Sequence, residues 1–182
     1  MQYLLAILAL LYPFLAYAGL VYGSPQWVAG ILVVILLVRL KWGKSLFSPL
    51  FVNLFVILLS LSLGYSLLTG SPLGIRLYPV LVNLVFLLVF ASSLFSSQTV
   101  VERLARLKEP DLPASGVAYT RKVTLVWSVF FILNGTIAAY TAFFTNIQIW
   151  TLYNGFISYL LIAILGGSEW LIRQKVRQRH EH

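Results

Sequence analysis

The chain has 182 residues, of which 60% are hydrophobic and 10% are charged, and its formal net charge is +8. Its mean hydropathy of +0.90 lies above the range of soluble proteins, so residues 1–182 are predicted to form a single integral membrane domain. The absence of cysteine excludes disulfides, thiolate nucleophiles, iron-sulfur clusters and cysteine-type zinc sites.

Apolar segments follow one another along the chain, separated by turn-forming residues and free of charge at their centres. A bilayer core about 30 Å thick is crossed by about 20 helical residues, and backbone groups in lipid must bond within their own segment. Each segment is therefore predicted to be a transmembrane helix of an all-α bundle with about six spans. The predicted spans are 3–22, 25–40, 49–69, 77–96, 123–144 and 151–171. The second is short, and a re-entrant segment is the alternative for it.

Basic residues are concentrated in alternate connections. The stretches 39–48, 97–122 and 173–182 hold three, five and four Lys or Arg residues, which is twelve of the thirteen in the chain. The connections on the other side hold only Arg76. Because Lys and Arg are retained in the cytoplasm, this pattern predicts six spans with both termini cytoplasmic.

The long cytoplasmic connection is predicted to contain an interfacial helix at about 99–108. Thr99 and Glu102 have the spacing of a capping box, and Glu102 and Arg106 form an i,i+4 pair. Apolar residues form a stripe at helical spacing on the other side: Val100, Val101, Leu104 and Leu107. Such a helix is expected in the headgroup layer.

Two interpretations of this basic connection remain open. Its basic residues are Arg103, Arg106, Arg121 and Lys122, which suit a docking surface for an acidic partner or for anionic lipid. The alternative is a connector whose positive charge only fixes the topology. The basic tail that starts at Arg173 also favours anionic headgroups over nucleic acid, because no aromatic residues are interleaved in it.

Four asparagines, Asn53, Asn83, Asn134 and Asn154, lie one in each of the last four predicted spans. An amide in hydrocarbon seeks a partner, so hydrogen bonds between helices, on the order of 1 kcal/mol each, are the first interpretation. The second is a polar cavity that the last three of these asparagines line together with Thr136, Tyr140 and Tyr159. No carboxylate, lysine or histidine accompanies them, so the cluster has no group for proton transfer.

Other features concern packing and the outer face. Small residues four apart predict close helix contacts: Ser60 with Gly64, Ser62 with Ser66, and Gly135 with Ala139. Arg76 is the outer-face candidate, either for holding a lipid phosphate or capping a cavity entrance, or for extending to the interface without further function.

Enzyme motifs are missing from the sequence, which contains no HExxH, P-loop or Gly-x-Ser-x-Gly. The carboxylates Glu102, Glu109 and Asp111 alternate with basic residues at irregular spacing, so a metal site is not expected there. The sequence thus predicts no catalytic residue, no metal and no cofactor.

Three stretches carry a resemblance to a known family. These are RLYPVLVN (76–83), ERLAR (102–106) and YTRKVTLVWSVFFILNG (119–135). They resemble a family of uncharacterised bacterial inner-membrane proteins that accompany gene sets for aryl polyene or xanthomonadin-type pigments. The fifth predicted span is also distantly similar to the septation protein A family. The resemblance covers about 76–171 and implies an inner-membrane location, but it supplies no catalytic residues.

Two functions follow as expectations. The first is a non-enzymatic accessory or scaffold protein of envelope lipid or polyene pigment synthesis, whose basic face engages anionic lipid or an acidic protein such as an acyl carrier protein. The second is a small transporter or lipid translocator with a path lined by Asn and Tyr. The sequence leaves the lipid, the partner protein and the oligomeric state open.

Overall fold

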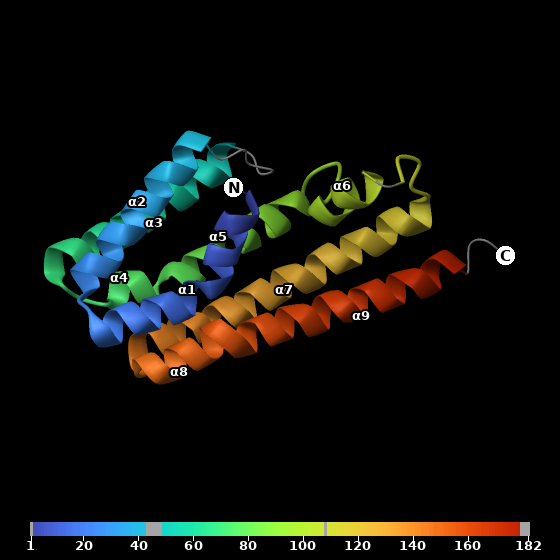
Figure 1. Ribbon diagram of the computed structural model, residues 1–182. Coiled ribbons are helices and arrows are strands. Elements are labelled where there is room, and N and C mark those ends of the chain that lie inside the picture. The colour runs from blue at the N-terminus through green and yellow to red at the C-terminus, as the bar shows by residue number, and fades with distance from the viewer. Residues whose placement is uncertain (1, 43–48, 108, 179–182) are drawn as a thin grey trace.

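The computed structural model describes residues 2–42, 49–107 and 109–178, with side chains over 11–34, 49–107 and 109–174. In these ranges the regular structure is helical and contains no strand (Figure 1), which confirms the all-α prediction. The helices are α1 (Gln2–Tyr22), α2 (Pro25–Trp42), α3 (Pro49–Thr69), α4 (Leu73–Arg76), α5 (Tyr78–Ser93), α6 (Val100–Arg106), α7 (Ala114–Phe144), α8 (Ile147–Leu152), the π-helical turn η1 (Tyr153–Ile157) and α9 (Ser158–Gln178).

Four stretches are long and apolar enough to cross a membrane: Pro49–Thr69, Leu73–Ser93, Ala114–Phe144 and Ile147–Gln174. Shorter apolar stretches, Leu11–Tyr22 and Pro25–Val34, come from α1 and α2 within the residues that the structure describes with side chains. The architecture is therefore compatible with a membrane protein.

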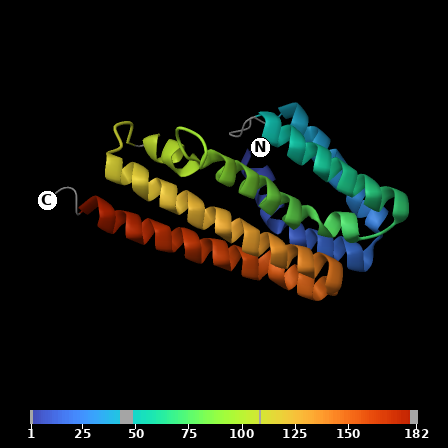
Figure 2. The same cartoon turned by 180° about the vertical axis from the view of Figure 1, so that it is seen from behind.

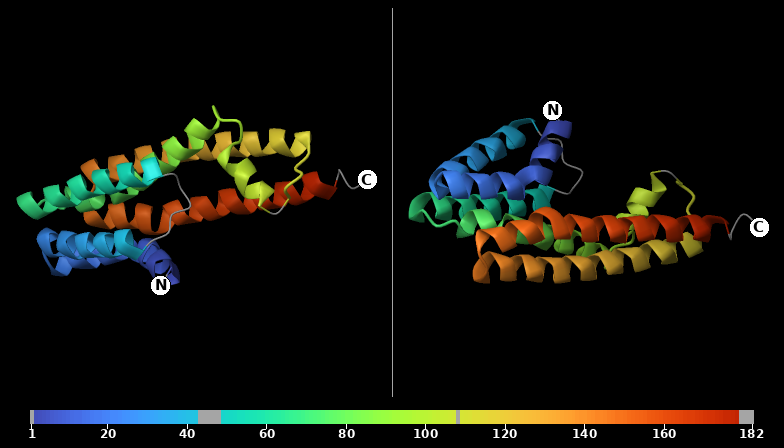
Figure 3. Two further views of the ribbon diagram at one scale, coloured as in Figure 1. Left: turned by 90° about the horizontal axis from the view of Figure 1, so that it is seen from above. Right: turned by 60° about the horizontal axis from the view of Figure 1, so that its bottom comes forward.

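The long helices run back and forth between two ends of the molecule. The α1–α2 turn, α4 and α8 lie at one end, which we call the α4 end, whereas α6 and the C-terminal part of α9 lie at the other, the α6 end (Figure 1). Seen from behind, α5 and α7 pack along each other in opposite directions (Figure 2). The α8–η1 stretch contacts both α1 and α7 (Figure 3).

Both ends of the predicted span 77–96 differ in the structure. The stretch predicted at 77–96 begins at Leu73 and is interrupted at Leu77, because Pro79 has no N–H to donate to the Ile75 carbonyl one turn earlier. It ends at Ser93, whose hydroxyl donates to the Phe90 carbonyl.

The last two long helices extend beyond the predicted spans 123–144 and 151–171. Helix α7 starts directly after the extended residue Pro113, and its first turns, which carry Arg121 and Lys122, precede the apolar part from which the span was predicted. The last stretch starts at Ile147, where the Asn146 side chain caps α8 by accepting from the Ile149 N–H at 2.9 Å.

Small residues determine where helices approach closely. A Cβ on Gly135 would lie 3.1 Å from the Cβ of Asn83, so this glycine permits the close α5–α7 contact. A Cβ on Gly74 would clash with the Ser62 carbonyl oxygen of α3. Among the described side chains the predicted contact at Ser60 and Gly64 is not seen, since Ser60 is exposed and a Cβ on Gly64 would have no described neighbour within 4 Å.

Candidate functional site

One face of α7 carries a row of buried small and polar side chains that we call the polar seam. Its members are Thr120, Thr124, Ser128, Asn134, Ala138 and Thr141, each at most 4% exposed. Except for the step of six from Ser128 to Asn134, they follow one another at three or four residues, and all of them lie on one side of the helix, toward α5 and η1. The hydroxyls of Thr124 and Ser128 donate to carbonyls one turn earlier in α7, so this part of the seam satisfies itself.

The centre of the seam is an amide cluster made by Asn83, Asn134, Tyr153 and Ser158. The Asn134 Nδ2 donates to the Asn83 Oδ1 at 2.9 Å and to the Ser158 Oγ at 3.1 Å. The Tyr153 hydroxyl donates to the Asn134 Oδ1 at 2.8 Å, and the Asn83 Nδ2 donates to the Pro79 carbonyl. The cluster therefore joins α5, α7, η1 and α9 through buried side chains.

The π-helical turn η1 brings two consecutive side chains to α7. Tyr153 bonds Asn134, while the Nδ2 of Asn154 donates to the Thr141 Oγ1 at 3.1 Å and to the Trp150 carbonyl. Such a widened turn is uncommon and is often found at functional sites. On its other side a Cβ on Gly155 would lie 3.0 Å from the Phe14 ring, so the glycine allows α1 to dock there.

Other residues of the predicted cavity lie outside this cluster. Tyr140 is 59% exposed, and its ring packs against the Phe144 ring with 5.4 Å between the ring centroids. Thr136 is exposed and donates to the Ile132 carbonyl of its own helix. Tyr159 is half-buried, and Asn53 is exposed on α3. The structure thus joins Asn83 and Asn134 by a hydrogen bond. Asn154 bonds Thr141 of the same seam, and Tyr140 lies outside the cluster on the surface.

Two members of the cluster, Tyr153 and Ser158, were not singled out from the sequence. Tyr153 precedes Asn154, and Ser158 follows it by one turn. Their closeness in sequence to Asn154, an asparagine in a predicted span, was the signal that could have identified them. The π-helical turn directs both Tyr153 and Asn154 toward α7, and the sequence pattern does not reveal that turn.

Arg76 binds the end of α7 rather than extending into solvent. Its Nη2 donates to the carbonyls of Thr141 at 2.5 Å and Thr145 at 2.6 Å. These oxygens belong to the last turn of α7, where helix carbonyls lack intrahelical partners and the helix dipole favours a cation. The guanidinium therefore closes the C-terminus of α7.

The short helix α4 is held from several sides. The Trp150 indole donates to the Arg76 carbonyl at 3.0 Å, and the Tyr12 hydroxyl donates to the Ile75 carbonyl at 2.6 Å. The Ser62 hydroxyl donates to the Gly74 carbonyl at 2.7 Å. Residues from α1, α3 and α8 thus converge on three successive carbonyls of α4.

At the α6 end, the helix predicted at about 99–108 is present as Val100–Arg106. The Thr99 Oγ1 accepts from the Glu102 N–H at 3.3 Å, which confirms the N-terminal cap. Glu102 is 4% exposed and accepts from the Arg106 Nε at 2.9 Å. Lys108, at the end of the predicted helix, lies outside the described residues.

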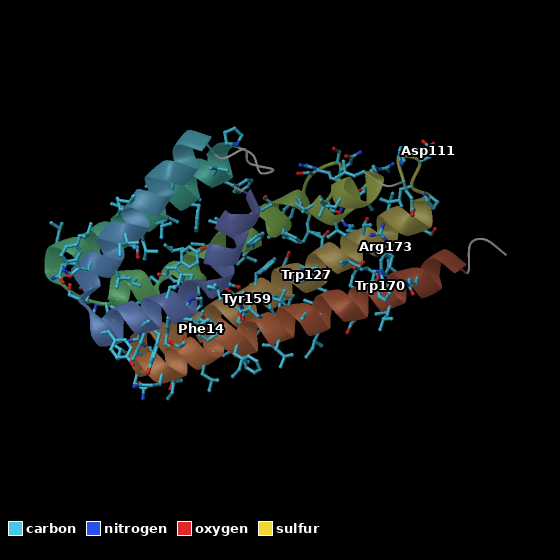
Figure 4. The ribbon with its side chains drawn as sticks, viewed as in Figure 1. Phe14, Asp111, Trp127, Tyr159, Trp170 and Arg173 are labelled. Atoms are coloured by element: carbon cyan, nitrogen blue, oxygen red, sulfur yellow. The ribbon has the colours of Figure 1, made fainter. Side chains whose placement is uncertain are left out.

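The four predicted docking residues divide into two pairs. Arg106 also donates to the Pro110 carbonyl at 2.8 Å, and Arg121 donates to the Leu94 carbonyl at 2.9 Å, so both contribute to holding the connection in place. Arg103 and Lys122 are exposed, as is Arg121 despite its hydrogen bond. Figure 4 shows Trp170 and Arg173 on α9 at this same end, near the connection that carries Asp111.

No protein-family model matches the chain, and a search of curated proteins and of solved structures likewise finds no match.

Proposed function

We propose that the protein is a non-enzymatic, multi-pass accessory or scaffold protein of the bacterial inner membrane. In this proposal its basic cytoplasmic end draws an acidic protein of an envelope lipid or polyene pigment pathway toward the bilayer. An acyl carrier protein is the partner class whose acidic surface fits this charge.

Charge and aromatic side chains support the membrane placement. The connections of the α4 end hold Arg76 alone, whereas twelve basic residues belong to the opposite connections and the C-terminal tail. By the positive-inside rule the α6 end is cytoplasmic, and six passes bring both termini to that side. Exposed aromatic residues of the kind that sit at membrane interfaces occur near both ends, with Tyr22 87% and Trp27 76% exposed at one and Trp170 58% exposed at the other.

The observation that carries the scaffold proposal is the contrast between the interior and the α6 end. In the interior, the amides of Asn83 and Asn134 are bonded to neighbouring helices and buried. At the α6 end, Arg103 on α6 and Lys122 on α7 are exposed, and hydrogen bonds join α5 to the start of α6 and to α7. A bonded interior with outward-facing charge suits recognition of a partner.

The translocation alternative has no such support. Its path requires water beside Asn134, but that side chain is 4% exposed and bonds three neighbouring side chains. Tyr140 and Thr136, which were expected to line the path, face away from the cluster.

The test uses the purified protein in a neutral detergent, mixed with an acyl carrier protein at low and high salt. Binding is expected to weaken as salt rises, because exposed charges are screened within about 10 Å at 0.1 M ionic strength. The double variant Arg103→Gln, Lys122→Gln is expected to lose the salt-sensitive binding, whereas Arg103→Lys, Lys122→Arg, which keeps both charges, retains it. The proposal fails if no salt-sensitive binding occurs and the neutral variant leaves lipid or pigment output unchanged.

A further inference from the structure

We infer that α6 and the turn before it bind the anionic headgroup layer of the cytoplasmic leaflet, with leucine and phenylalanine side chains in the lipid and a basic side chain on the phosphates. This inference rests on the proposed cytoplasmic position of the α6 end. It adds a lipid ligand to the proposed protein partner.

The first observation is a set of large apolar side chains that the described parts of the chain leave uncovered. Phe95 is 93% exposed, Leu107 81% and Leu104 56%. Leu104 and Leu107 lie three residues apart, on the outward side of α6. A connector that only faced water would carry polar side chains at these positions.

The second observation is that the orientation of α6 is fixed. Glu102 and Ala105 are buried on the side toward α7, at 4% and 1% exposure. The Val100 N–H donates to the Ser93 hydroxyl at 3.1 Å, and Arg121 donates to the Leu94 carbonyl. The first bond attaches the start of α6 to α5, and the second attaches the residue after α5 to α7. Together with the packing of α6 on α7, they keep the apolar stripe outward.

The third observation is the charge of the outward face. Glu102, the acidic residue of α6, faces inward and is paired with Arg106 at 2.9 Å. Arg103 is exposed beside Leu104. The outward side of α6 thus presents apolar groups with a positive charge and no negative one, which is complementary to anionic lipid.

The fourth observation is depth. The Tyr119 hydroxyl donates to the Glu169 carbonyl at 3.2 Å, so the first turns of α7 are level with the residue before Trp170. Arg121 connects Leu94 to these same turns. Because Trp residues concentrate at the membrane interface, this places Phe95 and the start of α6 at headgroup depth. Figure 4 shows Trp170 at the end of the molecule where Figure 1 shows α6.

The experiment places single cysteines in a chain that has none of its own. Leu104→Cys and Leu107→Cys carry a nitroxide label, and the protein is reconstituted in vesicles of phosphatidylcholine with or without phosphatidylglycerol. Collision with a water-soluble nickel reagent and with oxygen reports the depth of each label. Asp111→Cys is the water reference, and Leu133→Cys, from an exposed apolar position in the middle of α7, is the lipid reference.

In vesicles with phosphatidylglycerol, the labels at 104 and 107 are expected to lose nickel accessibility relative to position 111 and to lie between positions 111 and 133, as headgroup depth requires. Adding Arg103→Gln is expected to weaken this dependence on anionic lipid about fivefold, the effect of one charge near the membrane surface, whereas Arg103→Lys preserves it. No partner protein is present, so this result is independent of the detergent test of carrier-protein binding.

Two results would overturn the inference. In the first, both labels in anionic vesicles are as accessible to nickel as position 111. If the labels then lose nickel accessibility only after an acyl carrier protein is added, this face of α6 binds a protein and not lipid. In the second, the labels lose the same nickel accessibility with and without phosphatidylglycerol, and Arg103→Gln has no effect. This result would show that α6 does not bind the anionic headgroup.

Discussion

Single buried amides act as joints between helices in this protein. Asn134 bonds residues of α5, η1 and α9, whereas Asn53, the same residue type on α3, is exposed. The difference matters because a buried polar group that loses its partners keeps its desolvation cost, while an exposed amide has little to lose.

Asn134→Leu is expected to lower the free energy of unfolding by about 2 kcal/mol, because it leaves Asn83, Tyr153 and Ser158 without their shared partner. Unfolding of the purified protein in mixed detergent and SDS micelles, followed by tryptophan fluorescence, measures the change. Asn53→Leu is the matched control and should leave stability unchanged. Equal effects of the two substitutions would contradict the assignment of Asn134 as the joint.

Two tyrosine substitutions, compared in the same assay, distinguish a buried residue of the amide cluster from an exposed residue. Tyr153→Phe removes a hydroxyl that donates to Asn134 from a side chain 8% exposed, and should cost about 1 kcal/mol. Tyr140→Phe removes a hydroxyl from a side chain 59% exposed and should have no effect. A larger loss at Tyr140 would show that the predicted cavity, rather than the amide cluster, determines stability.

At the scale of elements, the packing of α3 against α4 depends on one glycine. Gly74→Ala introduces a Cβ that clashes with the Ser62 carbonyl and lies 2.6 Å from the Ser66 Oγ, so it should destabilise the protein by about 1–3 kcal/mol. Gly64→Ala, also on α3, meets no described atom within 4 Å and should be neutral or slightly stabilising. Melting temperatures in detergent compare the two, and a neutral Gly74→Ala would contradict this packing.

The N-terminal cap of α6 gives a local prediction. Thr99→Ala removes the acceptor of the Glu102 N–H and should cost about 1 kcal/mol of helix stability, while Thr99→Ser should retain most of it. Hydrogen exchange of the α6 amides measures this, with faster exchange expected in the alanine variant. Unchanged protection would mean that the contacts with α7 alone hold the helix.

The sequence predicted helix boundaries well where the length of an apolar segment determines them. It predicted them poorly where contacts with other helices determine them. The predicted 49–69 coincides with α3, because Pro49 starts it and Gly70, at φ 71°, follows its end. The start of α7 at Ala114 was missed, since hydropathy detects the apolar part of a helix and not its polar continuation. The π-helical turn and the choice of Asn134 over Tyr140 depend on how neighbouring helices are rotated, which one sequence does not encode in its periodicity.

At the scale of the whole molecule, the central claim is the separation of charge between the two ends. Arg76, at the α4 end, is bonded to the carbonyls of α7 and so completes the fold. Arg103 and Lys122, at the α6 end, are exposed, and we propose both lipid and protein recognition at that end. These two proposals depend on the α6 end being cytoplasmic, whereas the bonds of Arg76 do not.

The most direct test of this claim labels single cysteines with a membrane-impermeant maleimide in spheroplasts and in lysed cells. Pro72→Cys, at the α4 end, is expected to react in intact spheroplasts, whereas Asp111→Cys, on the connection after α6, is expected to react only after lysis. Labelling of Asp111→Cys in intact spheroplasts, with Pro72→Cys protected, would contradict the orientation and the functional proposals that depend on it.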